Sequence, residues 1–213
     1  MQNRLQGRRI FISMFIISAI AFLFWINIST ENQIEVSYKR SIQAPLFDIL
    51  DQAFQRDAIE FNPHPIPEKF WPLLGLENQQ HLNIVYQNNE PVALIIPATS
   101  QNGYGGEIKI IIAVSRDGHI IGVRILEHSE TRGLGDKIDI STDDWILAFD
   151  GKSLSNTSQK SWAVRKDGGD FDQISGATIT SKSVISKVFD SLRYFEQDKI
   201  RLFGQTISET ASL

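Results

Sequence analysis

The segment 172–184, DQISGATITSKSV, gathers small and hydroxylated side chains immediately before an apolar helical stripe. Between Val184 and Phe195 the apolar residues recur at helical spacing, which predicts a helix that begins near Ser181 or Ser183. The first N–H groups of a helix lack partners within it and carry partial positive charge. An anion such as a phosphate would therefore be stabilised just upstream of this helix.

Small and hydroxylated residues in this segment could bind such an anion. Ser175, Gly176 and Ala177 leave backbone room for a bulky ligand, and Thr178 and Thr180 offer hydroxyl groups that could hydrogen-bond to it or be esterified. The alternative is a hydroxyl-rich helix N-cap whose small residues serve tight packing. Residue types and spacing leave both interpretations open.

Other residue types that could do chemistry lack the spacing that it requires. The four histidines are scattered without ligand spacing, so we expect no metal site. Two aspartates at 143–144 are interpreted as a helix start rather than as paired catalytic acids. Ser153, Ser155 and Ser158 lack the context of a nucleophile, and the glycine turn at 103–106 could cradle phosphate but is explained by a hairpin link alone. The sequence thus predicts no catalytic side chain.

The composition of the 213-residue chain excludes several functions. There is no cysteine, which excludes disulfides, thiolate zinc sites and protein-ligated iron–sulfur clusters. The first 30 residues hold three arginines and no acid, so the remainder carries 18 basic against 25 acidic side chains, a net charge of −7. A mildly acidic chain without a basic run gives little electrostatic support for nucleic-acid binding.

The N-terminus has the pattern of a membrane anchor. Three arginines within residues 1–9 precede 19 uncharged residues, 10–28, which as a helix would extend roughly 28 Å, close to the thickness of the hydrocarbon core. Trp25 suits a membrane interface, and the arginines predict a cytoplasmic N-terminus with the rest of the chain outside. The alternative is a cleaved signal peptide, although no small-residue cleavage site follows the apolar run. Both interpretations export the main domain.

Beyond the anchor the sequence divides into a stalk and helical lead-in, 29–80, a main domain, 81–200, and a C-terminal tail, 201–213. In the lead-in, apolar residues over 42–54 recur at helical spacing. Four prolines over 63–72 predict a connection without regular structure.

Two β-hairpins dominate the main domain. The first occupies 81–96 with a turn at 88–89, and the second occupies 107–128 around an Arg-Asp-Gly turn. Loops and short helices are expected over 129–160, and one further strand with a Gly-Gly turn over 161–174. Together with the final helix these elements predict an α+β fold, a largely antiparallel sheet with flanking helices.

The residues Asp172-x-x-Ser175-Gly176-Ala177-Thr178 resemble the flavinylation motif of FMN-binding subunits in two related respiratory complexes. These are the C subunit of the sodium-pumping NADH:quinone reductase and the G subunit of the Rnf-type complex. The hairpin and glycine loop over 103–138, the Asp-Asp-Trp at 143–145 and the segment 162–184 are also similar to the Rnf-type protein. The similarity covers nearly the whole chain, including the single N-terminal anchor.

This resemblance implies a covalent cofactor. Thr178 would be esterified to the phosphate of FMN by a flavin transferase that uses FAD and recognises Asp172. A glycine loop would pack on the isoalloxazine ring, where this sequence has Arg132 in place of the usual proline, a change that should loosen the entry of the loop. The loop residues expected to bind the cofactor are Glu130, Thr131, Gly133, Leu134 and Gly135. The expected neighbours of Thr178 in cofactor binding are Ser175, Gly176, Ala177, Thr180 and Ser181.

The resemblance also implies a function. The chain would be an electron-relay subunit of an inner-membrane translocase, with its flavin domain in the periplasm. That complex would couple ferredoxin/NAD-type electron transfer, or reduction of a redox-sensing regulator, to ion movement. Its partners would be the other membrane subunits and, during maturation, the transferase. The alternatives are a stand-alone periplasmic flavin reductase and a membrane-anchored binding module without redox activity.

Overall fold

We describe residues 49–50, 54 and 59–210 of the computed structural model, and the backbone alone of residues 205–210. The proposed anchor, 10–28, and most of the predicted lead-in helix lie outside these residues. Within the described part of the chain, no helix combines the length and the apolar character needed to cross a membrane.

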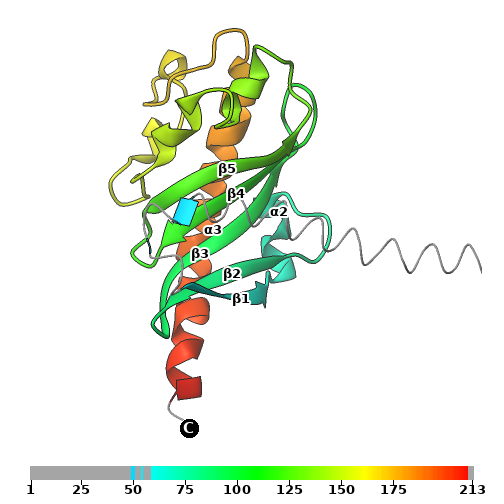
Figure 1. The fold of residues 1–213 in the computed structure, drawn as a ribbon. Helices are drawn as coiled ribbons and strands as arrows, with labels where there is room; N and C mark the ends of the chain where they lie inside the picture. Colours follow the sequence, from blue (N-terminus) through cyan, green and yellow to red (C-terminus); the bar gives the residue numbers. More distant parts are fainter. Residues whose placement is uncertain (1–48, 51–53, 55–58, 211–213) are drawn as a thin grey trace, which may run out of the picture. The chain divides into compact units, whose positions relative to one another are not determined.

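Five antiparallel strands form one sheet in the order of the chain (Figure 1). The strands are β1 (Ile59–Pro65), β2 (His81–Gln87), β3 (Glu90–Ser100), β4 (Ile108–Ser115) and β5 (Ile120–His128). The long helix α3 (Thr178–Thr210) packs along one face of the sheet (Figure 1). The predicted α+β class with a largely antiparallel sheet is therefore confirmed.

Both predicted hairpin turns are confirmed. Asn88 and Asn89 have φ angles of 53° and 64°, the pair of positive values that a type I′ turn needs and that asparagine tolerates. In the second hairpin Gly118 supplies the positive φ, at 90°. Strand β3 continues to Ser100, four residues past its predicted end at Ile96.

The prediction that the prolines of 63–72 prevent regular structure is wrong. Pro63 and Pro65 lie in β1, which pairs with β2 alone and so forms an edge of the sheet. Proline is tolerated in an edge strand because its missing N–H faces away from the ladder. Pro72 lies in the first turn of the short helix α2 (Trp71–Leu74), where no intrahelical N–H bond is lost.

Opposite faces of the sheet bury different partners. Alternate residues of β3 and β4, such as Leu94 and Ile112, join the apolar stripe of α3 in the main core. On the other face, Gly122 of β5 admits Ile49, because a Cβ at Gly122 would lie 2.8 Å from Ile49 Cγ2. The sheet is thus covered on both faces, in agreement with its nearly continuous apolar strands.

The segment between β5 and α3 folds over an aromatic cluster rather than into a strand. Phe149 packs against Trp145, Trp162 and Phe171 with ring centroids 5.6, 6.4 and 4.7 Å away. The strand predicted over 161–174 is wrong, because these residues form only one isolated bridge between Val164 and Phe171. Ring packing, not a strand ladder, holds this segment.

Short 3₁₀ helices supply the rest of this segment. They are η3 (Gly135–Ile138), η4 (Asp144–Phe149), η5 (Gln159–Ser161) and η6 (Arg165–Asp167), in addition to η2 (Glu68–Phe70) before α2. Asp143 caps η4 by accepting a hydrogen bond from the Trp145 N–H at 3.0 Å, which confirms the predicted helix start. The positive φ of Gly168, 87°, closes the turn after η6.

Candidate functional site

Three segments that are distant in the sequence meet at the Glu130 side chain. Glu130 Oε1 accepts a hydrogen bond from the backbone N–H of Gly105 at 3.0 Å, in the turn between β3 and β4. Its Oε2 accepts one from the Thr180 hydroxyl at 2.5 Å, in the first turn of α3. Glu130 itself lies in the loop after β5. Glu130 and Thr180 are buried, 7% and 0% exposed. One carboxylate therefore joins the β3–β4 turn, the glycine loop and the start of α3.

Glycines lie on both sides of this carboxylate, where a side chain would not fit. A Cβ at Gly135 would lie 2.8 Å from Glu130 Oε2, and a Cβ at Gly103 would lie 2.6 Å from Oε1 and 2.4 Å from the Gly106 carbonyl. Gly133 has a φ of 76°, and the Thr131 carbonyl accepts hydrogen bonds from the three N–H groups of residues 134–136. The glycine pattern thus builds a tight loop around a buried acid.

Helix α3 begins at Thr178, three to five residues before the start predicted near Ser181 or Ser183. Ser181 is buried inside the first turn, where its hydroxyl donates to the Ala177 carbonyl at 3.1 Å and accepts from the Ile174 N–H at 3.0 Å. The first intrahelical bond runs from Ser181 N to Ala177 O. Polar contacts made by these hydroxyl residues therefore start the helix before its apolar stripe begins, which hydrophobic periodicity could not reveal.

The three hydroxyl side chains of this turn have different surroundings. Thr180 and Ser181 are fully buried and hydrogen-bonded to protein groups. Thr178 is partly exposed, and its hydroxyl makes no hydrogen bond to the described residues. Only Thr178 among the three has a hydroxyl group available for chemistry.

The turn that precedes Thr178 is open to solvent and contacts the glycine loop. Ser175 and Gly176 are exposed, and Ala177 is buried. Gly176 has a φ of 80°, and a Cβ there would lie 3.0 Å from Leu134 Cδ2. Leu134 thus covers Gly176, which brings the glycine loop against the turn that the sequence singled out.

Large apolar side chains are exposed on each of the three segments that meet at Glu130. Tyr104 of the β3–β4 turn, Leu134 of the glycine loop and Ile179 of α3 are 72%, 43% and 56% exposed. Each is adjacent in sequence to a residue at the Glu130 carboxylate, namely Gly105, Gly135 and Thr180, and large exposed apolar side chains are typical of a surface that binds an apolar group. Tyr104 and Ile179 were not among the predicted site residues. The sequence could have indicated them, because Tyr104 lies within the glycine turn and Ile179 directly follows Thr178.

Asp172 contacts other residues and does not join the cluster at Glu130. Its exposed carboxylate pairs with Arg165, with Oδ1 3.1 Å from Nε. Its backbone carbonyl accepts a 2.6 Å hydrogen bond from Trp145 Nε1, which ties it to the aromatic cluster. Asp172 is thus held at a fixed place on the surface.

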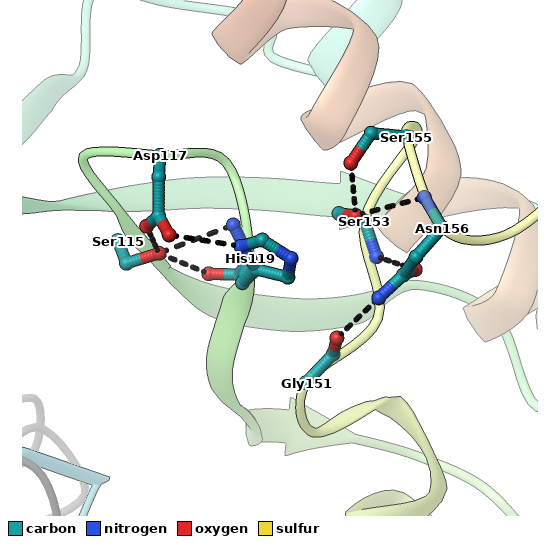
Figure 2. Close-up of polar contacts among 7 residues, drawn as sticks. All are labelled: Ser115, Asp117, His119, Gly151, Ser153, Ser155 and Asn156. Atoms are coloured by element: carbon teal, nitrogen blue, oxygen red, sulfur yellow. Dashed lines mark hydrogen bonds and ion pairs between the residues drawn. The ribbon is translucent and has the colours of Figure 1, made fainter.

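A serine–aspartate–histidine group in the β4–β5 turn resembles a hydrolase triad in composition only (Figure 2). The Ser115 hydroxyl lies 2.5 Å from Asp117 Oδ1, whereas the His119 ring contacts the other carboxylate oxygen at 3.1 Å. Nucleophilic serine needs the imidazole as its base. Here the carboxylate lies between the two, so this group stabilises a turn.

A second serine group faces a nearby cavity. The Ser153 hydroxyl contacts the Ser155 hydroxyl at 2.8 Å and accepts a hydrogen bond from the Asn156 N–H, while the Ser153 N–H donates to Asn156 Oδ1 (Figure 2). These contacts agree with its interpretation as a loop residue. The cavity of about 390 Å³ is lined by Asp117, Gly118, Ser153, Leu154, Ser155, Glu196 and Lys199. This cavity and the Glu130 cluster lie at opposite ends of β5, a strand of nine residues that extends roughly 30 Å. No group of three or more side chains suited to a metal ion occurs among the described residues.

The Asp117 contacts predict a small pH dependence of stability. The Ser115 hydroxyl, and secondarily His119, hold the pKa of Asp117 below its usual 3.8. The ionised carboxylate therefore stabilises the fold above pH 3.8, and this contribution is lost as the pH falls through the lowered pKa. Because Asp117 is exposed, Asp117→Asn should lower the free energy of unfolding by only a few tenths of a kcal/mol, on the order of a surface pair.

Urea unfolding at neutral pH and again below pH 3.8 measures this effect. The wild type and the Asn variant should differ at neutral pH and converge in acid. A difference that grows in acid would contradict the assignment.

Residues 103–193, which include β4, β5, the glycine loop and the start of α3, match the FMN-binding domain family and place the chain in a flavin-binding class of protein. Within that class, the chain belongs to the family of G subunits of ion-translocating oxidoreductase complexes. The G subunit from Pseudoalteromonas atlantica is 34% identical over 96% of this chain and 94% of its own length. The G subunit from Vibrio atlanticus is 36% identical over 98% of each chain, and that from Vibrio parahaemolyticus is 37% identical over 84% of this chain and 83% of its own.

Proposed function

We propose that Thr178 carries FMN through a phosphoester bond and that the chain relays electrons within an ion-translocating oxidoreductase complex. The observation that carries the proposal is the difference among the hydroxyls at the start of α3. The buried Thr180 and Ser181 hydroxyls are hydrogen-bonded to protein groups, while the Thr178 hydroxyl is partly exposed and without a hydrogen bond to the described residues. Thr178 is therefore a better acceptor than its neighbour Thr180.

The surroundings of Thr178 fit a phosphate. The N–H groups of residues 178–180 precede the first intrahelical bond, so they are free to donate to an anion at the helix N-terminus. Ser175 and Gly176 are exposed and leave the approach open, and Ala177 adds little bulk. Ser181 acts indirectly, because its hydroxyl shapes the turn itself.

The surroundings also fit an apolar ring. Leu134, Tyr104 and Ile179 would contact the isoalloxazine ring, and the loop from Thr131 to Gly135 would hold Leu134 in place. When bound, FMN supplies one- and two-electron transfer. The protein supplies a site that keeps this cofactor attached in a compartment where free flavin is scarce.

Attachment would proceed by transfer from FAD. The Thr178 Oγ forms a bond to the FMN-side phosphorus, the pyrophosphate P–O bond breaks, AMP leaves with the bonding electrons, and the hydroxyl proton goes to the transferase or solvent. Asp172 is presented at the surface, where a transferase could recognise it.

The relatives, which are named as G subunits of such a complex, support a place for this chain beside other subunits. With residues 10–28 as a single inner-membrane anchor, the flavin domain would lie in the periplasm. It would pass electrons between membrane partners of the translocase, with ferredoxin and NAD, or a redox-sensing regulator, at the ends of the chain of carriers.

Intact-mass measurement of the protein produced with a flavin transferase tests the attachment. A gain of one FMN unit, assigned to Thr178 by peptide mapping, is expected. A bare Thr178 in natively produced protein, with no flavin adduct elsewhere, would overturn the proposal. Co-purification with polytopic membrane subunits distinguishes the relay from a stand-alone flavin reductase, which would purify alone.

A further inference from the structure

We propose that Glu130 is a positioning residue: its carboxylate sets the rotation of the first turn of α3 so that the Thr178 hydroxyl faces the flavin transferase. This inference rests on the proposed attachment of FMN at Thr178. It differs from direct cofactor binding by Glu130, because the carboxylate would act through Thr180 and the protein backbone.

Burial and hydrogen bonding support an indirect role for Glu130. The side chain is 7% exposed, and its two oxygens accept separate hydrogen bonds from Gly105 and Thr180. A carboxylate can only accept hydrogen bonds, and such charge-assisted bonds are among the stronger ones in proteins. Glu130 is therefore committed to two protein donors and closed off from a ligand at the surface.

The glycines around Glu130 support the same conclusion. A Cβ at Gly135 would lie 2.8 Å from Glu130 Oε2, and a Cβ at Gly103 would lie 2.4 Å from the Gly106 carbonyl and 2.6 Å from Glu130 Oε1. Both loops therefore pack closely around the acid. A Cβ at Gly135 would also lie 3.3 Å from Thr180 Oγ1, so the same glycine makes room for both partners of the hydrogen bond.

Helix geometry explains how this contact reaches Thr178. Successive residues of an α-helix are about 100° apart around its axis, so residues two apart point in nearly opposite directions. Thr180 points inward to Glu130 and is fully buried, while Thr178 is partly exposed. Fixing the Thr180 hydroxyl inward therefore turns Thr178 outward, and loss of that bond would let the first turn rotate or fray.

Three variants test this role: Glu130→Ala, Glu130→Gln and Thr180→Val. Each is produced with the transferase and FAD, and the rate of flavin attachment is followed by intact mass alongside the free energy of unfolding. Glu130→Ala should slow attachment roughly tenfold to hundredfold, the cost of misplacing a reacting group. Thr180→Val should slow it too, although Thr178 and the carboxylate are unchanged.

Glu130→Gln should restore much of the rate. The glutamine carbonyl can accept from the Gly105 N–H while its amide group donates to the Thr180 oxygen. Asp198→Asn is the matched control, because Asp198 is also a buried acid on a hydroxyl, 2.9 Å from the Tyr194 oxygen, but lies far along α3. This variant should lose stability and keep the wild-type rate of attachment.

The outcomes separate the two proposals. If the wild type gains no flavin, the proposed function fails. If the wild type is labelled and both Thr180→Val and the folded Glu130→Ala protein are labelled at the same rate, the positioning role is overturned while the proposed function stands. The positioning role is also overturned if Asp198→Asn slows attachment as much as Thr180→Val, since stability alone would then explain the loss. If Glu130→Ala does not fold, Thr180→Val decides the question.

Discussion

Thr178→Val should abolish covalent flavin while leaving the domain folded. Valine has nearly the shape of threonine and a similar helix propensity, so the substitution removes little besides the hydroxyl. That hydroxyl makes no hydrogen bond to the described residues and is partly exposed. We therefore expect a change in the free energy of unfolding within about 0.5 kcal/mol, as for other surface substitutions. Fluorescence of the denatured protein band under ultraviolet light, with a thermal melt of the same sample, measures both effects.

Two variants control this result. Thr178→Ser keeps a hydroxyl at the same place and should retain the fluorescent band, while Thr142→Val makes the same change at an exposed threonine outside the motif and should also retain it. If the Thr178→Val protein is fluorescent and the Thr180→Val protein is not, the flavin is attached to Thr180 and the proposed site is wrong. The burial of Thr180, 0% exposed, makes that outcome the sharpest contradiction of the site.

Local sequence signals predicted the hairpins well because their turns depend on a few adjacent residues. Asn88, Asn89 and Gly118 take positive φ angles, and strands of alternating or continuous apolar residues flank them. The failures came where distant contacts decide. β1 tolerates prolines only because it is an edge strand, and the segment around Phe171 pairs through aromatic rings instead of a strand ladder.

The candidate site was predictable in its motif and not in its supporting contacts. Family resemblance singled out Thr178, whereas residue types alone left open both a phosphate site and a simple N-cap. The Glu130–Thr180 hydrogen bond joins residues 50 apart in the sequence, and no local pattern indicates it. Once the bond is known, Gly135 has a structural reason, because a Cβ there would lie 2.8 Å from the carboxylate oxygen.

Phe149→Ala should give the largest loss of stability among our predictions. Phe149 is 0% exposed and lies at the centre of the aromatic cluster, in contact with Trp145, Trp162 and Phe171. Replacing a buried phenylalanine by alanine leaves a cavity and typically costs about 3–5 kcal/mol. The loss should also alter tryptophan fluorescence, since two of the three neighbouring rings are indoles. Denaturant unfolding monitored by circular dichroism and fluorescence measures it.

Leu147→Ala is the matched control, because Leu147 belongs to the same short helix and is 38% exposed. It should cost much less than Phe149→Ala, since little buried area is lost. The cluster also reaches the attachment motif, through the hydrogen bond from Trp145 to the Asp172 carbonyl. Folded Phe149→Ala protein should consequently accept flavin more slowly than Leu147→Ala. Equal stabilities for the two variants would show that the cluster does not hold this half of the domain together, and equal rates of attachment would show that it does not position Asp172.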